Sequence, residues 1–158
     1  MADALFYHLT RSPLEGLLPV LIGKCRDAGW RVVVRGADPG RMDWLDQKLW
    51  LGPEEDFLPH GLAGGPHDAD QPVLLTTTAA IPNGAQALIA LDGAPVAPEE
   101  LAGLARALIV FDDGDQPAVQ RARDQWRALT AAGVGAQYWG EDGGRWVRKA
   151  ENRPQEGG

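Results

Sequence analysis

The sequence predicts an α/β domain of three layers, in which helices cover both faces of a largely parallel central sheet. Short apolar runs alternate with segments of helical periodicity along most of the 158 residues. Runs such as Ala87–Leu91 (ALIAL) and Ala107–Phe111 (ALIVF) are apolar throughout, as expected of strands that are covered on both faces. The length fits one domain with a single core.

The first strand and helix are predicted within residues 4–29. Ala4–Leu9 (ALFYHL) is a compact apolar run, and Ser12 and Pro13 follow it as the expected N-cap and first position of a helix that Gly29 ends. Apolar residues recur at intervals of three and four and define its buried face: Leu14, Leu17, Leu18, Leu21, Ile22 and Cys25. The single cysteine is therefore expected to pack in the core, without an internal disulfide.

Trp30–Val34 is predicted as the next strand, and a second helix is expected from Pro39 through Trp50. Asp38 would cap this helix. Its inward-facing residues would be Met42, Leu45 and Leu49.

The second half continues the alternation. Val73–Thr77 is a further strand, Pro98–Arg106 a short helix, and Gln116–Ala132 a strong amphipathic helix that ends at Gly133. Ala136–Trp139 and Arg145–Arg148 are expected to close the sheet. The predicted domain spans residues 1–149, and the polar segment 150–158 is expected to be a disordered tail.

The negative net charge of the chain disfavours nucleic acid as a direct partner. The formal charge of −7 argues against a broad electrostatic grip on DNA, so any role beside DNA should run through protein contacts. No run of about 18 apolar residues occurs, and the start, MADALFYHLT, lacks the basic region and cleavage site of a signal peptide. We therefore expect a cytoplasmic protein that contacts no membrane.

The alternation of strands and helices resembles a Rossmann-like nucleotide-binding domain, in which a glycine-rich loop after the first strand binds phosphate. The first strand–helix turn reads HLTRSPLEG, without GxGxxG, and GxxxxGK[ST] occurs nowhere. No cofactor is therefore expected. An alternative function is a small nucleotide- or phosphate-using hydrolase with Asp112 and Asp113 at a strand end, in FDDGD. The structural explanation, which we favour, is that Asp115 caps the helix beginning near Gln116.

The three histidines do not predict a metal site. His8, His60 and His67, even with Asp68 and Asp70, fit no known ligand spacing. We interpret His60 as a residue that orients its turn by hydrogen bonding.

Large apolar side chains occur in the turn-rich segment Asp46–Gly64, DQKLWLGPEEDFLPHGLAG. Because loops normally lie on the surface, Trp50, Phe57, Pro59 and His60 predict a preformed apolar surface, here called the ledge, that suits a protein partner. The alternative is that Trp50 and Phe57 pack inward against the sheet.

A second candidate surface lies on the Gln116–Ala132 helix. Arg123, Trp126 and Arg127 are three and four residues apart, so their side chains emerge on one face. Two guanidinium groups beside an indole suit an acidic peptide that ends in a hydrophobic residue. The alternative places Trp126 in the core and both arginines in water.

Two blocks resemble the chi subunit family of bacterial DNA polymerase III holoenzyme. The family pattern D-x-x-L-W, a spacer and F-x-P-H-x-L-A-G reads here Asp46, Leu49, Trp50, Phe57, Pro59, His60, Leu62, Ala63 and Gly64. The pattern A-R-x-x-[aromatic]-[K/R]-A reads Ala122, Arg123, Trp126, Arg127 and Ala128. The opening FYHL is similar to the family's F-Y-x-L, and the resemblance covers most of residues 1–140.

The resemblance implies a non-catalytic accessory subunit of the polymerase assembly in DNA replication. It would link the clamp-loader complex, through the psi subunit, to the acidic C-terminal tail of single-stranded-DNA-binding protein, and would meet nucleic acid only indirectly. Arg123 would clamp the tail carboxylate, Trp126 would form the pocket wall, and Arg127 would pair with tail aspartates. The ledge would bind psi or, as in some members, a helicase. Val119 stands where some members have a further lysine, for which Arg121 is the candidate replacement.

Overall fold

The computed structural model describes residues 2–50 and 60–153. Within these ranges the chain forms one eight-stranded sheet in the order β3-β4-β2-β5-β6-β1-β7-β8. The bounds are β1 Asp3–Leu9, β2 Val32–Arg35, β3 Gly61–Leu62, β4 Val73–Thr76, β5 Ala87–Leu91, β6 Arg106–Asp112, β7 Ala136–Asp142 and β8 Arg145–Asn152. Neighbouring strands are parallel except for the antiparallel β7–β8 pair.

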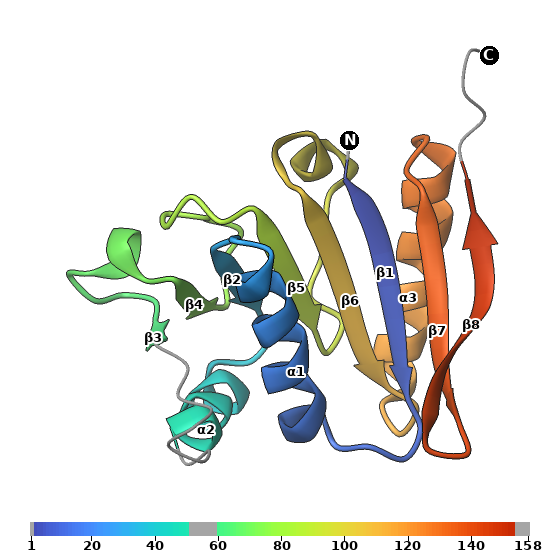
Figure 1. Ribbon diagram of the computed structural model, residues 1–158, viewed down its shortest axis with the longest axis horizontal. Helices are drawn as coiled ribbons and strands as arrows, with labels where there is room; N and C mark the ends of the chain where they lie inside the picture. Colours follow the sequence, from blue (N-terminus) through green and yellow to red (C-terminus); the bar gives the residue numbers. More distant parts are fainter. Residues whose placement is uncertain (1, 51–59, 154–158) are drawn as a thin grey trace.

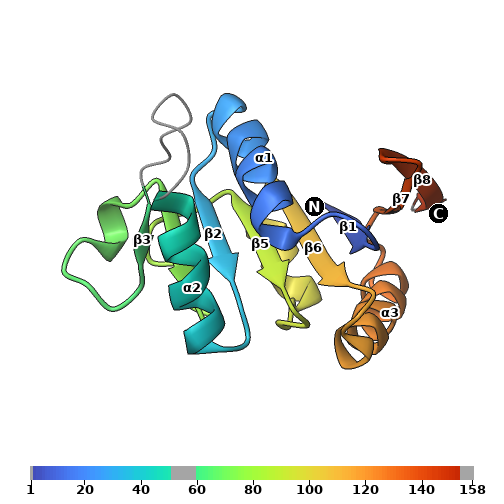
Figure 2. The same ribbon diagram turned by 90° about the horizontal axis from the view of Figure 1, so that it is seen from below.

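Helices cover both faces of this sheet, as Figures 1 and 2 show. α1 (Leu14–Asp27) and α2 (Pro39–Trp50) lie on one face, and α3 (Gln116–Ala131) lies on the other. Two apolar clusters correspond to these faces, one centred on α1 and α2 and the other on α3. The predicted α/β class with a largely parallel sheet is confirmed.

The central strands are buried on both faces. β2, β4 and β5 have no exposed residue, and β5 matches the predicted strand Ala87–Leu91 residue for residue. The helices that connect parallel strands cover both faces of the sheet. Successive residues of a central strand point to opposite faces, so all of their side chains are buried in apolar surroundings. Continuous apolarity was therefore a correct indicator of central strands here.

Two of the three predicted helix caps are confirmed. Asp38 Oδ2 accepts a hydrogen bond from the Arg41 backbone N–H at 2.9 Å, and Asp115 Oδ1 accepts one from the Ala118 N–H at 3.2 Å. The prediction for Ser12 is wrong. The N-cap of α1 is Pro13, and the Ser12 hydroxyl donates instead to the carboxylate of Glu141 on β7.

Some boundaries differ from the prediction. The expected helix Pro98–Arg106 is a short 3-10 helix, η3 (Pro98–Gly103), because β6 already begins at Arg106, paired with Asp3 and Ala87. β3 was not predicted, since a strand of two residues has no periodicity to detect. A second short 3-10 helix, η2, spans Asp68–Asp70 within the predicted loop.

The expected start of a disordered tail after residue 149 is also wrong. β8 continues to Asn152 because Ala150, Glu151 and Asn152 pair with Tyr138, Gln137 and Ala136 of β7. Polar composition did not reveal this pairing, because an edge strand that faces solvent needs few apolar side chains. Residues 154–158 lie outside the described residues.

Candidate functional site

A shallow hollow lies between α3 and the β7–β8 hairpin. Its lining residues are Arg123, Trp126 and Arg127 from α3, Tyr138 from β7 and Ala150 from β8, around a volume of about 290 Å³. The structure thus brings together all three residues singled out on the helix. Their spacing places them on one helix face, and the register pairs Tyr138 with Ala150 to form the opposing wall.

Trp126 is part core residue and part wall of the hollow. Its ring meets the buried Phe6 ring edge-on, with 5.3 Å between centroids, and the Tyr138 ring with 6.1 Å between centroids. The indole remains partly exposed where it lines the hollow. Trp126 therefore both packs against the core and lines the hollow, and the core contacts fix the orientation of its exposed part.

The two arginines differ in their contacts. In the part of the chain that the structure describes, Arg123 makes no hydrogen bond or ion pair, although it is exposed at the rim of the hollow. Arg127 lies 3.4 Å from a carboxylate oxygen of Asp124, in a pair that is largely exposed and therefore weak. Arg123 is the cation that is available to an anionic ligand.

Tyr138 belongs to a chain of hydrogen bonds that the sequence did not reveal. Its hydroxyl lies 2.8 Å from His8 Nδ1, and His8 Nε2 lies 2.9 Å from Asp113 Oδ1. Burial raises the pKa of Tyr138, the charge of Arg123 opposes this effect, and Asp113 reinforces it. Residues two apart in a strand share a face, so the sequence could have placed Ala136 and Tyr138 on the same face of the predicted strand. Only the strand order shows that this face packs against α3.

Val119 and Arg121, the two positions compared for the missing lysine, lie away from the hollow. Val119 is 3% exposed and packs in the α3-side core, so its position does not open onto the hollow. Arg121 lines a different hollow, next to Gly93 and Pro95. Arg121, the candidate replacement, therefore does not border the α3 hollow, because its helical phase directs it away from Arg123.

The ledge is described only in part, since Phe57 and Pro59 lie outside the described residues. Trp50, at the end of α2, is 48% exposed, and its ring centroid lies 4.1 Å from that of His60. The His60 side chain is 0% exposed, and its Nε2 lies 3.1 Å from both the backbone carbonyl and a carboxylate oxygen of Asp46. His60 thus supports Trp50 from beneath and does not itself present a surface to a partner.

The carboxylates at the end of β6 have structural roles. Asp112 Oδ1 accepts a hydrogen bond from the Gly114 backbone N–H at 2.7 Å. Asp113 hydrogen-bonds to His8, and Asp115 caps α3. These contacts account for the FDDGD sequence as a turn followed by a helix start, which is the structural explanation favoured above.

The first strand–helix turn holds an anion supplied by the chain itself. The backbone N–H groups of Thr10 and Arg11 each donate to Glu141 at 2.8 Å, and Ser12 donates through both its N–H and its hydroxyl. Burial raises the pKa of Glu141, but these hydrogen bonds outweigh it and lower the pKa to about 2. A Rossmann-like protein binds phosphate at this turn, whereas here a carboxylate from β7 fills it.

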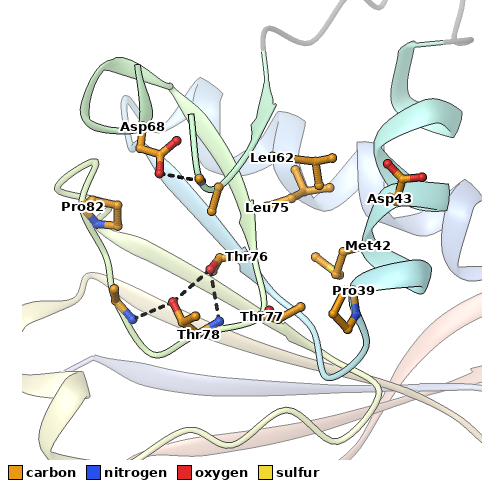
Figure 3. A pocket seen from close by; sticks show the side chains of 13 residues that line it. Pro39, Met42, Asp43, Leu62, Asp68, Leu75, Thr76, Thr77, Thr78 and Pro82 are labelled. Carbon is orange, nitrogen blue, oxygen red and sulfur yellow. Dashed lines mark hydrogen bonds between the residues drawn. The ribbon is translucent and has the colours of Figure 1, made fainter. Parts of the chain in front are cut away.

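A larger hollow, of about 520 Å³, lies where the end of β4 meets the start of α2 (Figure 3). Its apolar floor includes Met42, Leu62 and Leu75. The hydroxyls of Thr76 and Thr78 hydrogen-bond within their own loop, where Thr76 Oγ1 accepts the Thr78 N–H at 3.1 Å and Thr78 Oγ1 accepts the Ala80 N–H at 3.4 Å.

The histidines do not gather. His8 contacts Asp113, His60 contacts Asp46, and His67 Nδ1 lies 4.0 Å from Asp70 in an exposed loop. Across residues 2–50 and 60–153 no group of three or more metal-ligating side chains could hold a metal ion. Among the same residues, no helix has the length and apolarity needed to cross a membrane.

The structure is thus an α/β domain in which Glu141 fills the first strand–helix turn and a hollow opens between α3 and the β7–β8 hairpin. The family model described as "DNA polymerase III chi subunit, HolC" matches residues 1–137. The chain therefore belongs to the DNA polymerase III chi subunit family.

A curated relative gives the same indication. The chain is 28% identical over 91 residues to a protein of Rickettsia prowazekii (strain Madrid E) named "Probable DNA polymerase III subunit chi". The match covers 58% of this chain and 55% of the relative, so the chain spans about half the length of that protein.

Proposed function

We propose that this protein is a non-catalytic adaptor of the DNA polymerase III assembly that binds the acidic C-terminal tail of single-stranded-DNA-binding protein in the α3 hollow. The ledge would bind the clamp-loader complex through psi, or a helicase. The observation that carries the proposal is the exposed guanidinium of Arg123, which pairs with no carboxylate among the described residues and lies beside a hollow walled by Trp126 and Tyr138.

The chemistry of the hollow fits the end of an acidic chain. A guanidinium binds a carboxylate through two parallel hydrogen bonds, so Arg123 can hold a terminal carboxylate. The volume of about 290 Å³ is at the small end of ligand sites, which span about 300–1,000 Å³, and suits one terminal hydrophobic side chain. Arg127, whose pair with Asp124 is exposed, can exchange that partner for a tail aspartate.

Weak binding would suffice for such an adaptor. A micromolar dissociation constant corresponds to about −8 kcal/mol. When many tails are displayed along coated DNA and the protein is anchored at its ledge, linkage raises the effective concentration of the second contact.

The test is calorimetric titration of the protein with an acidic peptide ending in Ile-Pro-Phe, at low and moderate salt, and with the same peptide lacking its last Phe. We expect saturable binding that requires the Phe and weakens as salt screens the charges. Arg123→Ala should abolish binding without lowering the melting temperature. Arg121→Ala, on the same helix but at another hollow, is the matched control and should bind normally.

Unchanged affinity of Arg123→Ala would reject this site. Absence of binding to the native protein at millimolar peptide would reject the tail-binding function and leave only the family assignment.

A further inference from the structure

With a neutral His8, the hydrogen bonds of the Asp113–His8–Tyr138 chain determine which way its protons point. A carboxylate only accepts hydrogen bonds, so His8 Nε2, 2.9 Å from Asp113 Oδ1, carries the ring proton. In the neutral imidazole Nδ1 is then an acceptor, and the Tyr138 hydroxyl, 2.8 Å away, donates its only proton to it. The remaining lone pairs of the Tyr138 oxygen can only accept.

Packing holds this chain in place. The His8 ring stacks on the Phe111 ring, with 4.8 Å between centroids, and the Tyr138 ring packs edge-on against Phe111 and Trp126. The His8 side chain is only 18% exposed. This packing fixes the two rings relative to each other, and the hydrogen bond to His8 Nδ1 then engages the hydroxyl proton of Tyr138.

Tyr138 and Arg123 border the same hollow, and the guanidinium is near enough for its charge to act on the phenol. A peptide whose terminal carboxylate is held by Arg123 brings one further donor close to it, which is the backbone N–H of its last residue. This N–H loses water on entering the hollow, and leaving it unpaired would cost binding free energy.

We propose that Tyr138 is a specificity-determining residue that accepts a hydrogen bond from the last backbone N–H of the bound peptide, with His8 and Asp113 as positioning residues. The inference rests on the proposed tail-binding function and deepens it. The hollow would then recognise three parts of a C-terminal residue: its carboxylate by Arg123, its side chain by Trp126 and its amide by Tyr138.

The test compares the acidic peptide ending in phenylalanine with an analogue in which phenyllactic acid replaces that residue. The analogue keeps the carboxylate and the ring but has an ester in place of the last amide N–H. We expect the native protein to bind the ester roughly 3- to 10-fold more weakly, the usual effect of one neutral hydrogen bond. In Tyr138→Phe the amide peptide should bind as weakly as the ester, with less than about a 2-fold difference between them.

Tyr7→Phe is the matched control, because Tyr7 lies on the opposite face of the sheet, against Trp146 and α1. This variant should keep the native ratio of affinities for the amide and ester peptides. His8→Phe keeps an aromatic ring stacked on Phe111 but removes the Nδ1 acceptor. Its ratio of affinities should therefore fall toward that of Tyr138→Phe. These ratios report on the hydrogen bond even if a substitution lowers overall stability.

Equal affinity of the native protein for the amide and the ester would overturn the inference while leaving tail binding intact. A native-like ratio in Tyr138→Phe would also overturn it, since another group would then accept the N–H. Failure of the native protein to bind either peptide would instead overturn the proposed function and, with it, this inference.

Discussion

At the scale of single residues, the helical phase of each side chain on α3 decides which hollow it borders. Arg123 and Arg121 are two positions apart on one helix, yet they border different hollows. Val119 lies one turn before Arg123 and is buried. A basic pattern in a sequence therefore overstates the charge that one ligand meets, because helical phase distributes the side chains around the axis.

Glu141 offers a residue-scale prediction. Its folded-state pKa of about 2 lies below the ordinary value of 4.5, so the folded state binds fewer protons than the unfolded chain. The stability it contributes is therefore complete above about pH 4.5 and is lost as the pH falls toward 2. Glu141→Gln should remove this part of the acid dependence, as measured by urea unfolding at a series of pH values.

The exposed Glu99 provides the control for this experiment, because Glu99→Gln should leave the acid dependence of stability close to that of the native protein. If Glu141→Gln destabilised the protein equally at pH 7 and pH 3, the interpretation through proton linkage would be wrong. A uniform loss would point to altered packing of the turn.

At the scale of elements, the β7–β8 hairpin completes the candidate site. Sequence reasoning placed that site on α3 alone, but Tyr138 and Ala150 form the facing wall. The contacts of Glu141 with residues 10–12 fasten β7 to the β1–α1 turn and so help to hold the hairpin in position.

Ala150→Trp tests the role of the hairpin. The larger side chain should occupy the hollow and reduce affinity for the acidic peptide at least 10-fold by excluding its terminal ring. Because Ala150 is exposed, the free energy of unfolding should change by no more than about 0.5 kcal/mol. Calorimetric titration and urea unfolding measure the two quantities.

Val147→Trp is the matched variant, since it adds the same ring to β8 at an exposed position outside the hollow. It should bind the peptide normally. Undiminished binding by Ala150→Trp would mean that β8 forms no part of the site.

At the scale of the whole molecule, the two proposed surfaces belong to opposite ends of the sheet. β8, which borders the α3 hollow, is one edge strand, and β3, which directly follows His60 of the ledge, is the other (Figure 1). Ligands at distant sites with no shared contacts bind almost independently. We therefore expect the two proposed surfaces to bind their partners independently of each other.

Trp50→Ala should therefore weaken the complex with psi or a helicase, judged by co-elution on a sizing column, and leave the affinity for the acidic peptide unchanged. Arg123→Ala should show the reverse. Loss of both interactions in either variant would indicate unfolding or coupling between the surfaces, and retention of the psi or helicase complex by Trp50→Ala would reject the ledge as the interface.

The sequence by itself determined the layers, the order of most elements and the side chains on the exposed face of α3. Apolar runs, helical spacing and caps such as Asp38 and Asp115 act between residues close in the chain, so they can be read locally. Tertiary structure alone decided the far wall of the hollow, the Asp113–His8–Tyr138 chain and the filling of the first turn by Glu141. The Asp113–His8–Tyr138 chain and the contacts of Glu141 join residues more than 100 positions apart, whereas the wall of the hollow joins α3 to the hairpin that follows it. All of these contacts follow from strand order and register, which no local pattern encodes.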